Sequence, residues 1–125
     1  MKIGVMKFFL LLFGLSILLS NCSRHNCMST VETNKENFKK FLNIIKGREA
    51  GGKSTFVDEY KEAINFLSLV TGIDSKADYS STFGYRDKAD YKNDMKQWKK
   101  WYKENQCKIT NEYVDSVYKR VGLKR

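Results

Sequence analysis

The sequence contains no proline and only one histidine, His25. A lone histidine in a polar stretch cannot supply a histidine-based zinc site, and it argues against serine–histidine or cysteine–histidine catalysis. We therefore predict a noncatalytic protein that needs no metal and no cofactor. The absence of proline is typical of a mostly helical chain in which glycines end the helices.

Long apolar runs are scarce too, and the main one covers residues 8–19, after Lys2 and Lys7. A helix that spans a bilayer needs roughly twenty apolar residues, so this run is too short for a stable transmembrane anchor. A basic start, a short apolar core and a small-residue region together form a secretory signal. Residues 1–21 are therefore predicted to be a signal peptide.

The apolar run ends in Leu19-Ser20-Asn21-Cys22, which resembles the lipobox of bacterial lipoproteins. The resemblance implies cleavage before Cys22, a diacylglyceryl group on its thiol and an acyl chain such as palmitate on the new amino terminus. It also implies an extracytoplasmic position on the bacterial cell membrane. Since Ser23 is not acidic, family habit favours the outer membrane where there is one. Asn21 replaces the usual Gly, Ala or Ser, which leaves ordinary cleavage and an uncleaved anchor as alternatives.

The predicted mature chain is basic. Removing the signal takes away two lysines and no acid, so the net charge falls from +9 to +7. Such a balance favours association with anionic surfaces. Residues 22–32 are polar and without periodicity, which predicts a lipidated N-terminus and flexible tether. Residues 33–125 are enough for one small domain.

Two cysteines remain after Cys22, namely Cys27 and Cys107. An exported protein enters an oxidising compartment, where such a pair can form a disulfide that ties the tether to the end of the third helix. The alternative is that Cys27 is free and Cys107 packs as a small apolar residue. The sequence favours neither.

The first helix is predicted to begin at Thr33, because Thr33 and Glu36 form a capping-box pattern, and to end at Gly47. Residues 47–54 also match the P-loop expression G-x-x-x-x-G-K-[ST]. A working P-loop follows a buried strand, and the sequence before Gly47 is instead amphipathic and helical. We interpret the match as a turn in which Ser54 or Thr55 caps the next helix. The apolar stripe of the first helix is Phe38, Phe41, Leu42 and Ile45.

The second helix is predicted to end at Thr71 and Gly72. Asp58 and Glu62 are four residues apart on one face, so a paired-carboxylate acid–base site is an alternative to simple capping and solvation. Its apolar stripe is Phe56, Tyr60, Ile64 and Leu67, widened by Val57, Ala63 and Val70.

The connection over residues 73–86 is long for so small a domain and is rich in aromatic residues. Tyr79, Phe83 and Tyr85 can form a recognition surface, or they can fold back over the core. We favour the second role.

The third helix is predicted to run from Asp87 or Asp90 to Gln106. It combines an apolar stripe of Tyr91, Met95, Trp98 and Tyr102 with a basic row of Lys92, Lys96, Lys99 and Lys103. Interleaved rings and lysines would suit single-stranded nucleic acid or a membrane surface. The simpler interpretation is a bundle helix with a solvated lysine side.

Trp98, Trp101, Tyr102 and Asn105 form a Trp-x-x-Trp-Tyr-x-x-Asn run that resembles a pattern in uncharacterised bacterial envelope proteins. The resemblance implies a helical module in which Trp98 and Trp101 pack structurally. It implies no activity.

The last helix is predicted to begin near Thr110 or Asn111 and to end at Gly122, with Tyr113, Val114, Val117, Tyr118 and Val121 on its inner face. The fold class is therefore all-α, a small bundle of about four helices after a signal peptide and a flexible tether.

For function, we expect a membrane-anchored, noncatalytic binding module of the cell envelope that engages an envelope protein or an anionic polymer. One alternative is an immunity or inhibitor lipoprotein that blocks a toxin or lytic enzyme. Another is a small envelope hydrolase that uses Asp58, Glu62 and a loop tyrosine. An anchored location offers few nucleic-acid targets, and the sequence does not predict an oligomeric state.

Overall fold

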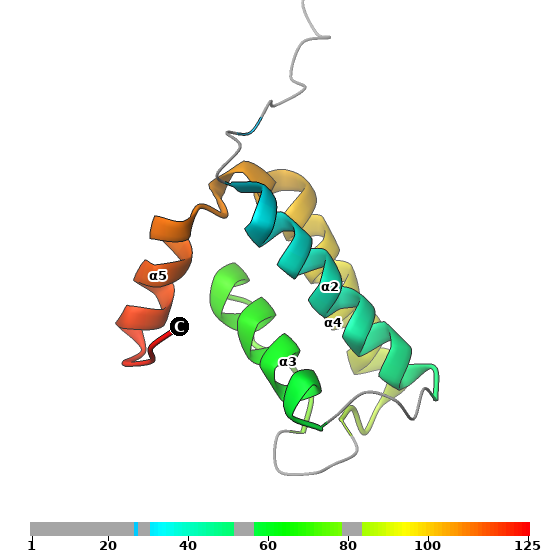
Figure 1. The fold of residues 1–125 in the computed structure, drawn as a ribbon. Coiled ribbons are helices and arrows are strands. Elements are labelled where there is room, and N and C mark those ends of the chain that lie inside the picture. Colours follow the sequence, from blue (N-terminus) through cyan, green and yellow to red (C-terminus); the bar gives the residue numbers. More distant parts are fainter. Residues whose placement is uncertain (1–26, 28–30, 52–56, 79–83) are drawn as a thin grey trace, which may run out of the picture.

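The computed structural model describes Cys27 and residues 31–51, 57–78 and 84–125 (Figure 1). These residues form four α-helices and a short 3-10 turn, η2, at Gln106–Lys108. They contain no strand, and the only bridge among them joins Asp78 to Gly84. The predicted all-α fold is confirmed. The helices are α2 (Glu32–Glu49), α3 (Val57–Thr71), α4 (Lys88–Asn105) and α5 (Asn111–Arg120).

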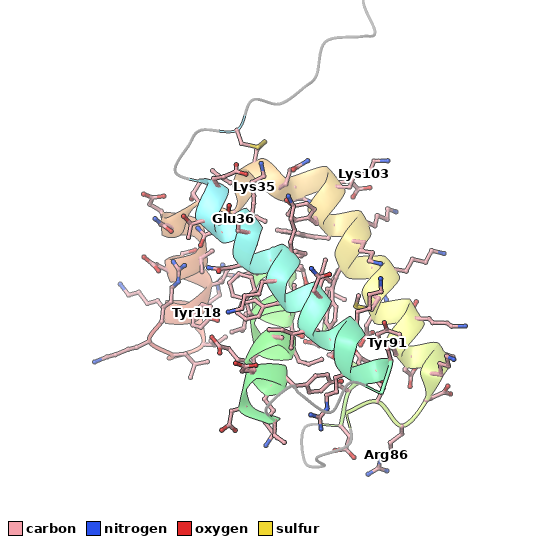
Figure 2. All side chains as sticks on the ribbon, turned by 45° about the vertical axis from the view of Figure 1, so that its right-hand side comes forward. Lys35, Glu36, Arg86, Tyr91, Lys103 and Tyr118 are labelled. Atoms are coloured by element: carbon pink, nitrogen blue, oxygen red, sulfur yellow. A yellow bond between two sulfur atoms is a disulfide. The ribbon has the colours of Figure 1, made fainter. Side chains whose placement is uncertain are left out.

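The helices form a bundle with two distinct ends. In both views α2 and α4 run side by side, while α5 lies on the other side of α3 from α4 (Figures 1 and 2). We call the end with Cys27, the start of α2 and η2 the disulfide end. The opposite end holds the start of α4 and residues 84–87, and we call it the loop end.

Aromatic rings fill the core between α2, α3 and α4. Phe38 of α2 is fully buried and stacks on Trp101 of α4 at 5.9 Å. It also meets Tyr102 at 4.9 Å and Phe66 of α3 at 6.4 Å. Each aromatic pair adds about 0.5–1.5 kcal/mol beyond the area that it buries. All four apolar residues predicted for the first helix are buried, whereas Phe56 of the second lies outside the described residues.

The predicted start of the first helix is wrong. α2 begins at Glu32, and Val31 occupies its N-cap without a capping side chain, while Thr33 lies inside the helix. Val31 is 1% exposed, so packing holds the chain in helical conformation before the capping box. Asn34 in the first turn is also buried, and its packing likewise holds this part of the chain in helical conformation.

The predicted end of this helix is also wrong, because α2 continues through Gly47 to Glu49. The added residues gain tertiary partners: the Arg48 guanidinium lies 4.8 Å from the centre of the Tyr60 ring, and Glu49 accepts a hydrogen bond from the Tyr60 hydroxyl at 2.9 Å. The left-handed residue that follows is Gly51, with φ of 87°. Its N–H donates to the Arg48 carbonyl.

The starts of α4 and α5 and the end of α3 agree with the prediction, whereas α4 ends at Asn105 rather than Gln106 and α5 ends at Arg120 rather than Gly122. Asp87 caps α4 by accepting from the Ala89 N–H at 2.7 Å, and Thr110 caps α5 by accepting from the Tyr113 N–H at 3.1 Å. α3 ends at Thr71 as predicted. Val121 was wrongly assigned to the inner face of the last helix. It is 50% exposed, because α5 ends at Arg120 and the chain turns away after it.

Candidate functional site

The clearest candidate for a binding surface is a row of lysines along α4. Successive residues of an α-helix lie about 100° apart around its axis, which places all six α4 lysines within about 120° of its circumference. Every one of them is exposed. The row is about 22 Å long, because each residue adds about 1.5 Å. We call it the lysine face: Lys88, Lys92, Lys96, Lys99, Lys100 and Lys103.

The charge of the lysine face is not neutralised by the described part of the chain. None of the ion pairs formed there involves these six lysines. Of the acids on α4, Asp94 is buried, while Asp90 and Glu104 fall outside the lysine sector of the helix. Like charges four residues apart repel each other by about 0.2–0.5 kcal/mol per pair. The face is therefore a persistent positive surface that raises the energy of the free protein.

α2 carries lysines as well, and one of them, Lys35, lies near Tyr102 of α4. Burial raises the pKa of Tyr102 on α4, and the nearby Lys35 ammonium opposes that rise, which places the α2 lysine beside α4. Lys35 pairs with Glu32 at 3.2 Å. Lys39 and Lys46 follow Lys35 at helical spacing on the same flank, and both are exposed.

The aromatic residues of α4 face away from the lysines. Trp98 is fully buried, and Trp101 and Tyr102 pack on Phe38, as predicted for structural aromatics. Figure 2 shows Tyr91 between α2 and α4, while Lys103 projects outward from the bundle. Tyr91, Trp101 and Tyr102 are half-buried and packed against the core, so the lysine face itself carries no ring on which bases could stack.

A buried carboxylate fixes the loop end of α4. Asp94 is 1% exposed, and its Oδ2 atom accepts three hydrogen bonds. The donors are the Lys76 N–H at 2.8 Å, the Ser75 hydroxyl at 3.0 Å and the Tyr85 hydroxyl at 2.8 Å. Sequence reasoning missed this role. The available signal was that Asp94 lies within the apolar stripe of Tyr91, Met95 and Trp98.

Of the two roles left open for the aromatic residues of the 73–86 connection, Tyr85 takes the favoured one and folds back over the core. Tyr85 is 9% exposed and belongs to the core. Burial raises the pKa of its hydroxyl, and the Asp94 carboxylate that it bonds adds to the rise. Tyr79 and Phe83 lie outside the described residues. Tyr85 therefore covers the core and is not available to a partner.

A second contact at the loop end joins Gly84 to α2 and α3. A Cβ atom at Gly84 would lie 2.5 Å from the Tyr60 hydroxyl and 2.9 Å from Glu49 Oε1. The residue also has φ of 79°, a conformation that favours glycine. Burial raises the pKa of Tyr60, and the hydrogen bond to Glu49 raises it further. These contacts hold the connection against the bundle.

At the disulfide end, Cys27 is joined to Cys107, with the two Cα atoms 5.0 Å apart. Of the two alternatives left open by the sequence, the structure therefore contains the disulfide. Cys107 lies in η2, directly after α4, so the bond fastens the segment before α2 to the end of the lysine-bearing helix. The two residues are 80 positions apart in the chain.

Polar contacts around Asn34 support this end. The Asn34 side chain is fully buried and donates to the Ile109 carbonyl at 3.0 Å and to the Asn111 side chain at 2.9 Å. Its oxygen accepts from the Arg125 guanidinium at 2.8 Å. This one amide therefore joins the start of α2 to the entry to α5 and to Arg125.

The candidate carboxylates Asp58 and Glu62 line an open groove of about 420 Å³ between α3 and α5. Both are exposed, and the tyrosine beside them is Tyr118, whose pKa is raised by burial and then by Glu62. Tyr85 lies instead at Asp94. Of the loop tyrosines, Tyr85 therefore does not join the two carboxylates, and Tyr79 is outside the described residues.

The remaining questions concern metal sites, membrane spans, the P-loop-like match and Cys22. Residues 27, 31–51, 57–78 and 84–125 contain no cluster of three or more metal-ligating side chains. No helix within these ranges is both long and apolar enough to cross a membrane. The first residues of the P-loop-like match, from Gly47 to Glu49, are part of α2. Its Lys53 and Ser54, like the lipidation candidate Cys22, lie outside the described residues.

No protein-family profile matches the chain, and comparisons with curated proteins and with solved structures found no similar protein.

Proposed function

We propose that this protein is a lipid-anchored, noncatalytic binding module of the bacterial cell envelope, and that its lysine face engages an anionic partner. The observation that carries the proposal is the uncompensated row of six lysines on α4. Mutual repulsion makes such a row unfavourable in the free protein, and an anionic partner would relieve it. Charges held on one helix also favour rapid association with an oppositely charged surface.

The rigidity of α4 supports a role in binding. Asp94 fixes one end of the helix to the 73–86 connection, and the disulfide at Cys107 fixes the other. Between them, Trp98 is buried in the core. A preorganised charged surface loses little conformational entropy when it binds.

The proposed location rests on the N-terminal sequence pattern and on the disulfide. Residues 1–21 have the composition of a signal peptide, and Cys22 follows a lipobox-like run. A disulfide between Cys27 and Cys107 is typical of an oxidising compartment outside the cytoplasm. Both features favour export, and the lipobox-like run favours lipidation of Cys22.

The binding proposal can be tested by salt elution from an immobilised polyanion such as heparin. The variant replaces Lys92, Lys96, Lys99 and Lys103 with glutamine. The matched control also introduces four glutamines, in place of exposed cations of α3, α5 and the C-terminal segment: Lys61, Lys119, Arg120 and Lys124. We expect the α4 variant to elute at clearly lower salt than the control, although both lose the same charge. Equal elution of the two variants would show that net charge alone binds the polyanion, and would contradict a specific lysine face.

A further inference from the structure

The disulfide limits how far the folded domain can lie from a lipidated Cys22, an inference that rests on the proposed anchoring. Five peptide steps separate Cys22 from Cys27, and they span at most about 18 Å when fully extended. Cys27 is bonded to Cys107, immediately after α4. The C-terminal end of α4 is therefore held within about one tether length of the membrane surface.

The lysine face begins at this attachment point. Lys103 lies four residues before Cys107, and Lys88 lies about 22 Å further along the helix. If α4 stood upright on the membrane, only the lysines near its C-terminal end would lie close to the lipid headgroups. If α4 lay flat with its lysine face down, all six would. At physiological ionic strength charges are screened over about 8 Å, so the two orientations differ strongly in electrostatic energy.

The charge distribution favours the flat orientation. A lysine close to an anionic membrane contributes about 1 kcal/mol, and the upright orientation engages only the lysines near Lys103. The disulfide end carries acids beside cations, so an upright helix would present a mixed charge to the membrane: Glu32, Glu36, Glu104 and Glu112 lie there with Lys35, Lys103 and Lys108. The acyl anchor already confines the domain, so orienting it costs little further entropy.

We propose that α4 lies along the membrane with its lysine face on anionic lipid headgroups, held there by the acyl anchor and the disulfide. The partner of the lysine face is then the membrane that carries the protein. Because α5 lies on the other side of α3 from α4, this orientation turns α5 and the groove at Asp58 and Glu62 away from the lipid (Figure 2).

The test is an amine-labelling footprint of the acylated protein, purified from membranes and added to preformed vesicles. One set of vesicles is phosphatidylcholine alone, and the other also contains phosphatidylglycerol. We expect Lys92, Lys96, Lys99 and Lys103 to react about five-fold more slowly on the anionic vesicles, the ratio that corresponds to about 1 kcal/mol per lysine. High salt should restore their rates. Lys61, Lys119 and Lys124 serve as internal controls and should react equally on both vesicles.

Two results would overturn the inference. Equal labelling of the α4 lysines on both vesicles would show that headgroups do not cover them. Slower labelling confined to Lys100 and Lys103 would show an upright helix. A matched pair of variants, Lys92→Gln/Lys96→Gln and Lys119→Gln/Lys124→Gln, sharpens the result. Only the first should reduce the protection of Lys99.

The same samples separate this inference from the proposed function. Intact mass shows whether the protein carries acyl chains. The absence of acyl chains would overturn both the anchoring and the orientation. If an acylated protein shows unprotected lysines on anionic vesicles but still depends on its lysine face for polyanion binding, the proposed function stands. In that case the membrane is not the partner.

Discussion

The two ends of the bundle are held together by different chemistry. At the disulfide end, a covalent bond joins Cys27 to Cys107, supported by the buried Asn34 amide. At the loop end, the side chains of Asp94 and Glu49 accept hydrogen bonds from tyrosines, and no disulfide is formed among the residues described there. The stability of the disulfide end should therefore fall on addition of reductant. The stability of the loop end should fall when a carboxylate is removed or a tyrosine ionises. α4 is therefore fixed at both ends by independent means.

The largest effect should come from breaking the disulfide. In the chain-entropy account, a cross-link across 80 positions stabilises a protein by about 4.5 kcal/mol. We expect the Cys27→Ser/Cys107→Ser variant to lose about that much free energy of unfolding and more than about 15 °C in Tm. Thermal denaturation checks it, with Cys22→Ala as the control that leaves the bond intact. An unchanged Tm would mean that the disulfide end is held by packing alone.

Removing the carboxylate at the loop end should have a similar but smaller effect. Asp94→Ala leaves the Tyr85 hydroxyl, the Ser75 hydroxyl and the Lys76 N–H without their acceptor. Each unsatisfied buried group costs about 1–3 kcal/mol, and partial hydration reduces the total, so we expect a loss of about 3 kcal/mol. Urea denaturation measures it. Asp90→Ala, on the same helix, should stay within about 0.5 kcal/mol. Equal losses in the two variants would refute the assigned role of Asp94.

The close approach at Gly84 predicts a loss of about 2–3 kcal/mol for Gly84→Ala, because a methyl group would strike the Tyr60 hydroxyl and the backbone would be strained as well. Gly72→Ala separates the two causes. Gly72 has φ of 68° but nothing within 4 Å of its would-be Cβ, so it should lose only the backbone part, about 1 kcal/mol. Comparable losses at both positions would show that Tyr60 does not restrict Gly84.

The tyrosines of the loop end predict alkaline sensitivity. Burial and neighbouring carboxylates raise the folded-state pKa values of Tyr60 and Tyr85 above the unfolded value of 10.0. Their contribution is therefore fully present below pH 10 and is lost as the pH rises above it, by about 1.4 kcal/mol per pH unit for each tyrosine. Stability curves between pH 9 and pH 11 should be less steep for Tyr60→Phe than for the natural protein. Parallel stability curves for the two proteins would show that ionisation of Tyr60 does not contribute to the alkaline loss of stability.

The smallest effect has the opposite sign. Gly47 lies inside α2, is exposed and has nothing within 4 Å of a would-be Cβ. Gly47→Ala should therefore stabilise the protein by about 0.5–1 kcal/mol, since alanine favours a helix interior more than glycine does. Destabilisation in the same denaturation experiment would favour the helix end at Gly47 that the sequence alone suggested.

The sequence predicted what depends on local signals and missed what depends on contacts between distant residues. The apolar stripe through Phe38 and the helix starts at Asp87 or Asp90 and near Thr110 or Asn111 follow from short-range patterns. The stripe is buried, and α4 and α5 begin directly after Asp87 and Thr110. The predicted end of α2 was wrong, because Arg48 and Glu49 extend the helix through contacts with Tyr60 of α3. No local pattern encodes that pairing.

The candidate site shows the same division. The lysine row was visible at helical spacing, and the structure adds that Lys88 and Lys100 share its sector. The sequence could not choose between a disulfide and two free thiols, because Cys27 and Cys107 are brought together only by the fold. No role for Asp94 was predicted from the sequence. Its role depends on Ser75 and Tyr85, which reach it from the preceding connection.

The central claim is that an acylated Cys22 and a Cys27–Cys107 disulfide together hold the domain at a membrane. The most direct measurement is the intact mass of the protein extracted from membranes of its native host, after alkylation of free thiols, beside the Cys22→Ala variant. We expect a chain that starts at Cys22, carries added acyl mass and takes up no alkylating reagent, and we expect the variant to lack the acyl mass. An unmodified chain, or one in which Cys22 is alkylated, would contradict the account.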